Sequence, residues 1–153
     1  MPETGVFPVF NNVFKIGKAG KTSAAADMVA IKDMESFSVS MDNNIEEWTP
    51  MDQEGWVRRL QTGKGFSITL TGKRNVGDPG NDYVAGLAWK TGQETETKFQ
   101  WEFPSGLNVE FDCVVNVTTP GGGASTDVEA LEFEVMSNGK PAVTEPSQGG
   151  EGA

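Results

Sequence analysis

The sequence predicts a mainly β fold: a β-sandwich or small barrel of six to seven strands with one short helix packed on it. Three observations lead to this prediction. Apolar and polar residues alternate strictly in several stretches, as they do in strands with one buried face. Residues typical of turns, such as Gly, Pro, Asn and Asp, separate these stretches. Only one segment has apolar residues near helical spacing.

The chain begins with an irregular N-terminal arm and a short strand. Residues 1–12 have no periodic pattern, whereas Val13 to Ile16 has the pattern of a strand. The following Gly17 to Thr22 resembles the end of a phosphate-binding loop, but Lys15 stands where that motif needs its first Gly. We therefore interpret this stretch as a mobile basic loop and not as a nucleotide site.

Two longer strands are predicted next, with a long connection between them. Phe37, Val39 and Met41 alternate with polar residues, and so do Phe66, Ile68 and Leu70. The polar segment 43–64 between them is interpreted as a long, partly exposed hairpin loop, a kind of segment that often serves binding or assembly. Because Trp, Met and Arg are enriched at interfaces, five of its residues are candidate contacts with another subunit: Trp48, Met51, Trp56, Arg58 and Arg59. The alternative is that its large side chains fold back onto their own domain.

The helix is predicted after a loop rich in Asp, Gly and Pro. Asp78 or Asn81 can cap it, and Gly92 ends it. Four apolar residues fall near helical spacing inside it: Tyr83, Val84, Leu87 and Trp89. We expect Trp89 and Trp101 to belong to the core because they lie on apolar faces.

A hairpin follows, and its strands meet at Pro104-Ser105-Gly106. Its second strand has Glu110 and Asp112 opposite an apolar face that includes Cys113, and a last strand carries Glu132 and Glu134 in the same way. If these two strands are neighbours, four carboxylates crowd one surface. Residues 139–153 have little to bury and are predicted to form a flexible tail, which leaves residues 1–138 as one domain.

The composition excludes several classes of function. The net charge is −10, and the whole excess lies in residues 77–153, so the chain is a poor candidate for binding nucleic acid. It has no histidine and a single cysteine, and no catalytic, cofactor or metal-ligating constellation is recognisable. We therefore expect no enzyme activity, no cofactor and no metal. No apolar run is long enough for insertion into a membrane.

Four stretches together resemble the major tail (tail tube) proteins of long-tailed bacteriophages of the lambda-like type. The stretches are Ala30 to Met34, Gly65 to Leu70, Asp82 to Gly92, and Phe103 to Gly106 with the alternation after it. The resemblance implies a tail-tube fold, six copies in a ring, and rings stacked into a hollow tube. It also implies that each copy gives four strands to a continuous inner barrel, here at about 34–43, 65–74, 107–118 and 128–137.

The resemblance also implies a role for the acidic residues, a set of partners and a location. Acidic side chains would line the lumen, so that DNA slides through without adhering: Glu110, Asp112, Glu132, Glu134, Glu35 and Asp42. The implied partners are other copies of the chain, the tape measure protein, and the tail terminator and baseplate proteins. The implied location is the virion, after assembly in the host bacterial cytoplasm.

Two alternatives remain open from the sequence. One is a tube protein of a secretion or contractile injection system with the same fold. The other is a monomeric carbohydrate-binding β-sandwich that uses its tryptophans as stacking platforms.

Overall fold

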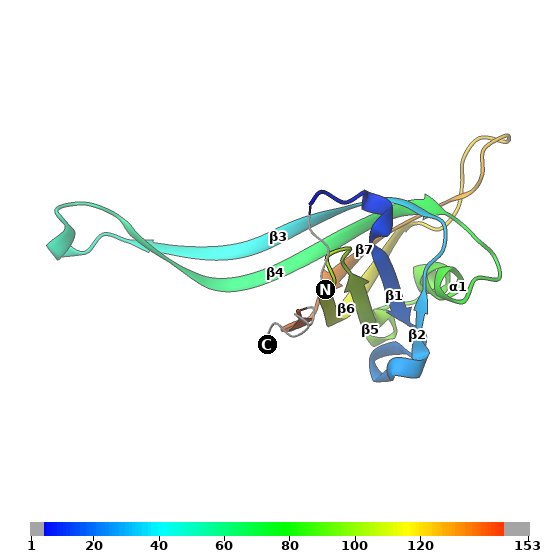
Figure 1. Ribbon diagram of the computed structural model, residues 1–153, viewed down its shortest axis with the longest axis horizontal. Helices are drawn as coiled ribbons and strands as arrows, with labels where there is room; N and C mark the ends of the chain where they lie inside the picture. The colour runs from blue at the N-terminus through cyan, green and yellow to red at the C-terminus, as the bar shows by residue number, and fades with distance from the viewer. Residues whose placement is uncertain (1–4, 146–153) are drawn as a thin grey trace.

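A single antiparallel sheet forms the body of the protein (Figure 1). The structure is a computed structural model that describes residues 5–145. The strand order is β2-β1-β5-β6-β7-β4-β3, and β8 pairs with the free part of β6. The strands are β1 (Val13–Gly17), β2 (Met28–Ala30), β3 (Met34–Trp48), β4 (Arg58–Lys73), β5 (Glu96–Glu102), β6 (Asn108–Thr119), β7 (Ala130–Ser137) and β8 (Ala142–Thr144).

The sheet folds over so that its two ends face each other across the core. β1 and β3 are separated by four strands in the sheet, yet the rings of Phe14 and Phe37 are 4.7 Å apart. Phe66 of β4 and Phe111 of β6 likewise meet edge to face at 4.8 Å. The mainly β prediction is confirmed. The sandwich-like core, however, comes from one folded, unclosed sheet in which the described residues form eight strands.

β6 connects the two halves of the folded sheet. Its residues 108–114 pair with β5, and its residues 113–119 pair with β7. The alternating apolar residues of β6 point into the core along its whole length, and Cys113 is fully buried among them. Because apolar residues alternate along this one long strand, the same face of β6 contributes core side chains to both halves of the folded sheet.

Helix α1 (Pro79–Gly86) closes one end of the core. Asp78 is its N-cap, and its carboxylate accepts a hydrogen bond from Asn81 N at 3.0 Å and from Lys32 N at 3.1 Å. Asn81 is fully buried, and its amide donates to the carbonyls of Lys32 and Lys73. The predicted cap is confirmed, and these bonds tie the helix to the segment just before β3 and to the end of β4.

The strands at 34–43, 65–74, 107–118 and 128–137 are found as β3, β4, β6 and β7, and they are consecutive in the sheet. Two other predictions are wrong. Part of the predicted tail is ordered, because Ala142–Thr144 forms β8 against Asn108–Glu110; residues 146–153 lie outside the described residues. Trp89 is 81% exposed, since the helix ends at Gly86 and the following 3-10 turn directs this side chain away from the core.

Candidate assembly surfaces

The most prominent surface feature is an arm formed by the outer parts of β3 and β4 (Figure 1). The sequence predicts a loop over residues 43–64, but most of this segment is paired strand. β3 continues to Trp48 and β4 begins at Arg58, with the register Trp48↔Arg58 to Asn43↔Lys64 and one irregularity after Asn44. Only residues 49–57 form the turn. Polar residues can pair here because the arm has no core face that would demand apolar alternation.

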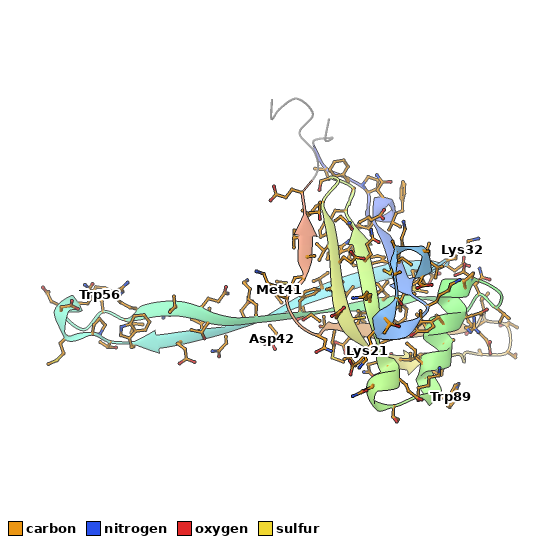
Figure 2. The ribbon with its side chains drawn as sticks, turned by 90° about the horizontal axis from the view of Figure 1, so that it is seen from below. Lys21, Lys32, Met41, Asp42, Trp56 and Trp89 are labelled. Atoms are coloured by element: carbon orange, nitrogen blue, oxygen red, sulfur yellow. The ribbon has the colours of Figure 1, made fainter. Side chains whose placement is uncertain are left out.

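The five predicted contact residues all lie at the outer end of this arm. Met51 is 101% exposed, Trp56 is 76% exposed and Trp48 is 43% exposed. Arg58 and Arg59 are held locally: the Arg58 guanidinium lies 5.6 Å from the centre of the Trp48 ring, and Arg59 Nε lies 2.9 Å from Glu47 Oε2. Figure 2 shows Trp56 at the tip, far from the body of the molecule. The alternative that these side chains fold back onto their own domain is thereby excluded.

Several further apolar side chains are exposed along the arm. They are Val39, Met41, Ile45, Val57 and Leu60, each between 39% and 59% exposed. A two-stranded hairpin without a layer against it is marginally stable in water. An arm with this composition is typical of a segment that another molecule covers.

The second surface is the outer face of the sheet, opposite the core. Directly paired residues of antiparallel strands point to the same side. The register therefore places Ser36, Thr71 and Glu132 in one row, and Ser38, Thr69, Glu134 and Asn116 in the next. On β3, β4, β7 and the second half of β6, this face consists mostly of hydroxyl, amide and carboxylate side chains, with one cation, Lys73, among the described residues. The apolar exceptions are Met136 and Val114, which lie in the row of Ser67.

The predicted lumen residues all lie on this outer side, but they do not crowd together. Glu132 and Glu134 are half-buried and face Thr71 and Thr69 across the β4 pairing. Glu110 and Asp112 lie instead on the first half of β6, between β5 and β8. The expected crowding of four carboxylates is wrong because the β6–β7 register starts only at Cys113.

The remaining acidic residues have local partners or lie at the arm. Glu35 forms an ion pair with Lys73 at 3.3 Å, and Asp42 lies opposite Gly65 where the arm leaves the body (Figure 2). Lys98 Nζ lies 2.8 Å from Asp112 Oδ1, and this hydrogen bond raises the pKa of Lys98. The acidic face is thus partly neutralised, which the sequence does not reveal because Lys98 precedes the hairpin turn.

The part of the chain that the structure describes has neither a recognisable metal site nor a reactive cysteine. No group of His, Cys, Asp or Glu in residues 5–145 has the arrangement of a metal site. Burial raises the pKa of the Cys113 thiol to about 12, so this cysteine is a core residue and not a nucleophile at neutral pH. No helix of the described chain is long and apolar enough to span a bilayer.

The basic loop does not form a phosphate-binding loop. Gly20–Thr22 is a single 3-10 turn and not the start of a long helix. Lys21 Nζ lies 3.5 Å from Gln93 Oε1, and Ser23 is buried with its hydroxyl donating to Gly20 O at 2.6 Å. The loop is thereby held against the turn before β5.

Comparison by sequence finds no relatives: no model of a known family and no curated protein matches the chain. Comparison by structure does find similar proteins. A chain from the tail of an empty gene transfer agent particle with C6 symmetry matches with a TM-score of 0.73 and 16% identity, over 91% of this chain and 99% of that one. The protein has the tail-tube fold. This likeness confirms the fold that the four sequence stretches predict.

Two further structures have the same fold. A chain from the virion of a native gene transfer agent particle matches with a TM-score of 0.68 and 15% identity, over 91% of this chain and 99% of that one. A chain from the sheath–tube complex of an extracellular contractile injection system in the extended state matches with a TM-score of 0.55 and 11% identity, over 92% of each chain. The TM-scores establish the tail-tube fold. Because the sequence identities are this low, the function has to be argued from the surfaces.

Proposed function

We propose that copies of this chain assemble into the hollow tail tube of a phage-like particle, as a structural component with no catalytic role. The observation that carries the proposal is the arm: a long hairpin with exposed apolar side chains, projecting from a tail-tube fold. Such a hairpin becomes stable when another surface covers it, and in an assembly a second copy of the chain can provide that surface.

Rings of six copies are the proposed unit of the tube. The matching gene transfer agent tail has C6 symmetry, and the four-stranded part of the sheet here offers β3 as an open edge. An unpaired edge strand of this length favours pairing with another chain. Joining the four strands of successive copies edge to edge would close a barrel around a lumen.

The face of β3, β4, β7 and the second half of β6 is the proposed lumen wall, with Glu132, Glu134, Glu35 and Asp42 on it. Its hydroxyl and carboxylate side chains provide few cations for phosphate groups, so DNA would pass with little adhesion. Glu110 and Asp112 share their side of the sheet with Lys98 and Gln100 and contribute to the wall only if this part of the sheet also faces inward. In this proposal the tube also meets the tape measure, terminator and baseplate proteins, and it belongs to the virion after assembly in the host cytoplasm.

A tube of a contractile injection system is the second candidate, because a chain of such a sheath–tube complex has the same fold. Genes for terminase and tape measure proteins beside this one would favour the phage-like particle, whereas sheath and secretion baseplate genes would favour the injection system. A glycan-binding monomer is disfavoured. Trp56 and Trp89 lie at opposite ends of the molecule (Figure 2), and Trp101 is stacked on Phe103 at 3.9 Å with its Nε1 donating to Asn12.

Electron microscopy of the purified chain tests the proposal. We expect negative-stain images to show hollow rods or six-membered rings at high protein concentration, in equilibrium with monomers at low concentration. A chain that stays monomeric at all concentrations, and also in the presence of its neighbouring tail proteins, would overturn the proposal.

A further inference from the structure

A large apolar groove lies at the base of the arm. Its volume is about 650 Å³. One wall comes from Val39, Met41 and Phe66, where β3 and β4 leave the body. The opposite wall comes from Trp101, Phe103 and Val109, with Val143 of β8 at its rim. The stacked rings of Trp101 and Phe103 and the paired β8 fix this second wall, so the groove exists before any partner binds.

The groove is basic as well as apolar. Lys64 and Lys140 line it, and no acidic residue does so within the described part of the chain. On a chain with a net charge of −10, a groove of this kind selects an occupant that has apolar side chains beside carboxylates.

The tip of the arm has this chemistry. Met51 and Trp56 are the two most exposed large apolar side chains of the arm, and Asp52 and Glu54 lie between them. No basic residue lies in the turn 49–57. Apolar anchors flanked by carboxylates therefore match an apolar groove flanked by lysines.

The tip cannot reach the groove of its own chain. Met41 is at the groove, and Trp48 lies seven residues further along the extended strand, a span of about 23 Å. The two strands of the arm are paired over this whole span and point away from the body (Figure 2). The occupant must come from another molecule.

The chain ends that lie outside the described residues are poor occupants. Residues 146–153 follow β8 at the rim of the groove, but their sequence, Pro-Ser-Gln-Gly-Gly-Glu-Gly-Ala, has no large apolar side chain. Residues 1–4, Met-Pro-Glu-Thr, have one. Neither segment offers two apolar anchors with two carboxylates.

We infer that the arm tip of one copy, with Met51 and Trp56, inserts into the groove at the arm base of a second copy, with Asp52 and Glu54 facing Lys64 and Lys140. The contact joins two different patches of the same chain. It is therefore heterologous: the copy that donates its tip keeps a free groove, and the copy that receives the tip keeps its own tip free, so the assembly can continue. The inference rests on the proposed function and specifies which surfaces carry the assembly.

A crosslinking experiment tests the contact directly. The double variant Gln53→Cys/Val143→Cys places one thiol at the tip and one at the groove rim, and leaves Met51, Trp56 and both lysines in place. The native Cys113 is fully buried and does not compete. With a short bismaleimide we expect a ladder of covalent multimers. The matched control Gln53→Cys/Lys90→Cys, with the second thiol beside Trp89 at the opposite end of the molecule, should stay monomeric on the gel.

Charge reversal provides a second, independent measurement. Lys64→Glu/Lys140→Glu and Asp52→Lys/Glu54→Lys should each raise the protein concentration needed for assembly by about tenfold or more, and their combination should restore it. Equal crosslinking in both cysteine variants, or no rescue in the combined charge variant, would overturn the inference. If wild-type rods form in that case, the proposed tube function still stands; if the wild type forms no rods under any condition, that function fails whatever the crosslinks show.

Discussion

Lys98 and Asp112 form an ion pair across the β5–β6 pairing, with 2.8 Å between Nζ and Oδ1. The pairing places the two strands of the central hairpin side by side in one sheet. β5 and the first half of β6 therefore present Lys98 and Asp112 on the same face of the sheet. Any surface to which Asp112 belongs also includes a lysine.

Replacing Lys98 by Met should change stability in a way that depends on pH. Hydrogen bonding to Asp112 raises the pKa of Lys98 in the folded state above its ordinary value of 10.5. The stabilisation is thus fully present below pH 10.5 and is lost as the pH rises through the folded pKa. Because both side chains are partly exposed, we expect less than about 1 kcal/mol at pH 8. Urea unfolding at pH 8 and pH 11 measures it.

The exposed Lys90→Met variant is the control for this measurement. The difference between wild type and Lys98→Met should shrink at pH 11, whereas the difference between wild type and Lys90→Met should change little. A Lys98→Met difference that grows with pH would contradict the assignment of the ion pair.

Replacing Asn81 by Leu should destabilise the fold. Its buried amide donates to the carbonyls of Lys32 and Lys73, and its oxygen accepts from Asn75 N and Arg74. Leu has a similar volume but leaves these backbone groups without a partner, which costs about 2–4 kcal/mol in free energy of unfolding. Chemical denaturation measures the loss. The exposed Asn44→Ala in the arm should change the same quantity by less than about 0.5 kcal/mol.

Two glycines of α1 should respond in opposite ways to alanine. A Cβ at Gly80 would collide with the carbonyl oxygen of Ala30, whereas a Cβ at Gly86 meets no atom within 4 Å. Gly80→Ala should therefore lower the free energy of unfolding by about 2 kcal/mol or more, because the contact between α1 and β2 must open. Gly86→Ala should raise it by up to about 1 kcal/mol, the difference in helix propensity. Thermal unfolding of both variants provides the comparison, and equal melting temperatures would contradict it.

The strands and the helix start were predictable because their signals are local. Asp78 before Pro79 is a capping signal within one turn, and the alternation around Phe133 depends only on its neighbours. Register was not predictable. Glu110 and Glu134 look equivalent in the sequence, but β6 pairs with β7 only from Cys113 onward, so these carboxylates lie on different parts of the sheet.

The arm and β8 were missed for a related reason. Residues 43–48 carry no alternation, since no core lies against them, and their strand is defined only by pairing with residues 58–64. Ala142-Val143-Thr144 is short and lies among Gly, Pro and Glu residues, so its pairing with Asn108–Glu110 has no signal of its own. The signal that singled out the candidate contact residues was their type: Trp48, Met51 and Trp56 are large and lie in a polar segment.

Reversing the charge of Glu132 and Glu134 should reveal which face lines the lumen. If the face of β3, β4, β7 and the second half of β6 lines it, rods of Glu132→Lys/Glu134→Lys should retain duplex DNA at low salt and release it steeply as salt is added. Rods of Glu110→Lys/Asp112→Lys should retain less DNA, because these residues lie on the other half of the folded sheet. Sedimentation of rods with labelled DNA measures both. Equal retention, or retention only in the second variant, would contradict the assignment.

Removing the arm should separate folding from assembly. Residues 44–63 can be replaced by Asn-Gly, a two-residue turn that joins the directly paired Asn43 and Lys64. None of the buried core residues of the described chain lies in the removed segment, so the free energy of unfolding should change by less than about 1 kcal/mol. Rods should disappear, because the arm tip with the exposed Met51 and Trp56 is gone. Urea unfolding and negative-stain microscopy of the same sample measure the two effects. A shortened chain that still forms rods would show that the arm is not needed for assembly, and one that does not fold would show that the arm stabilises the body of the protein.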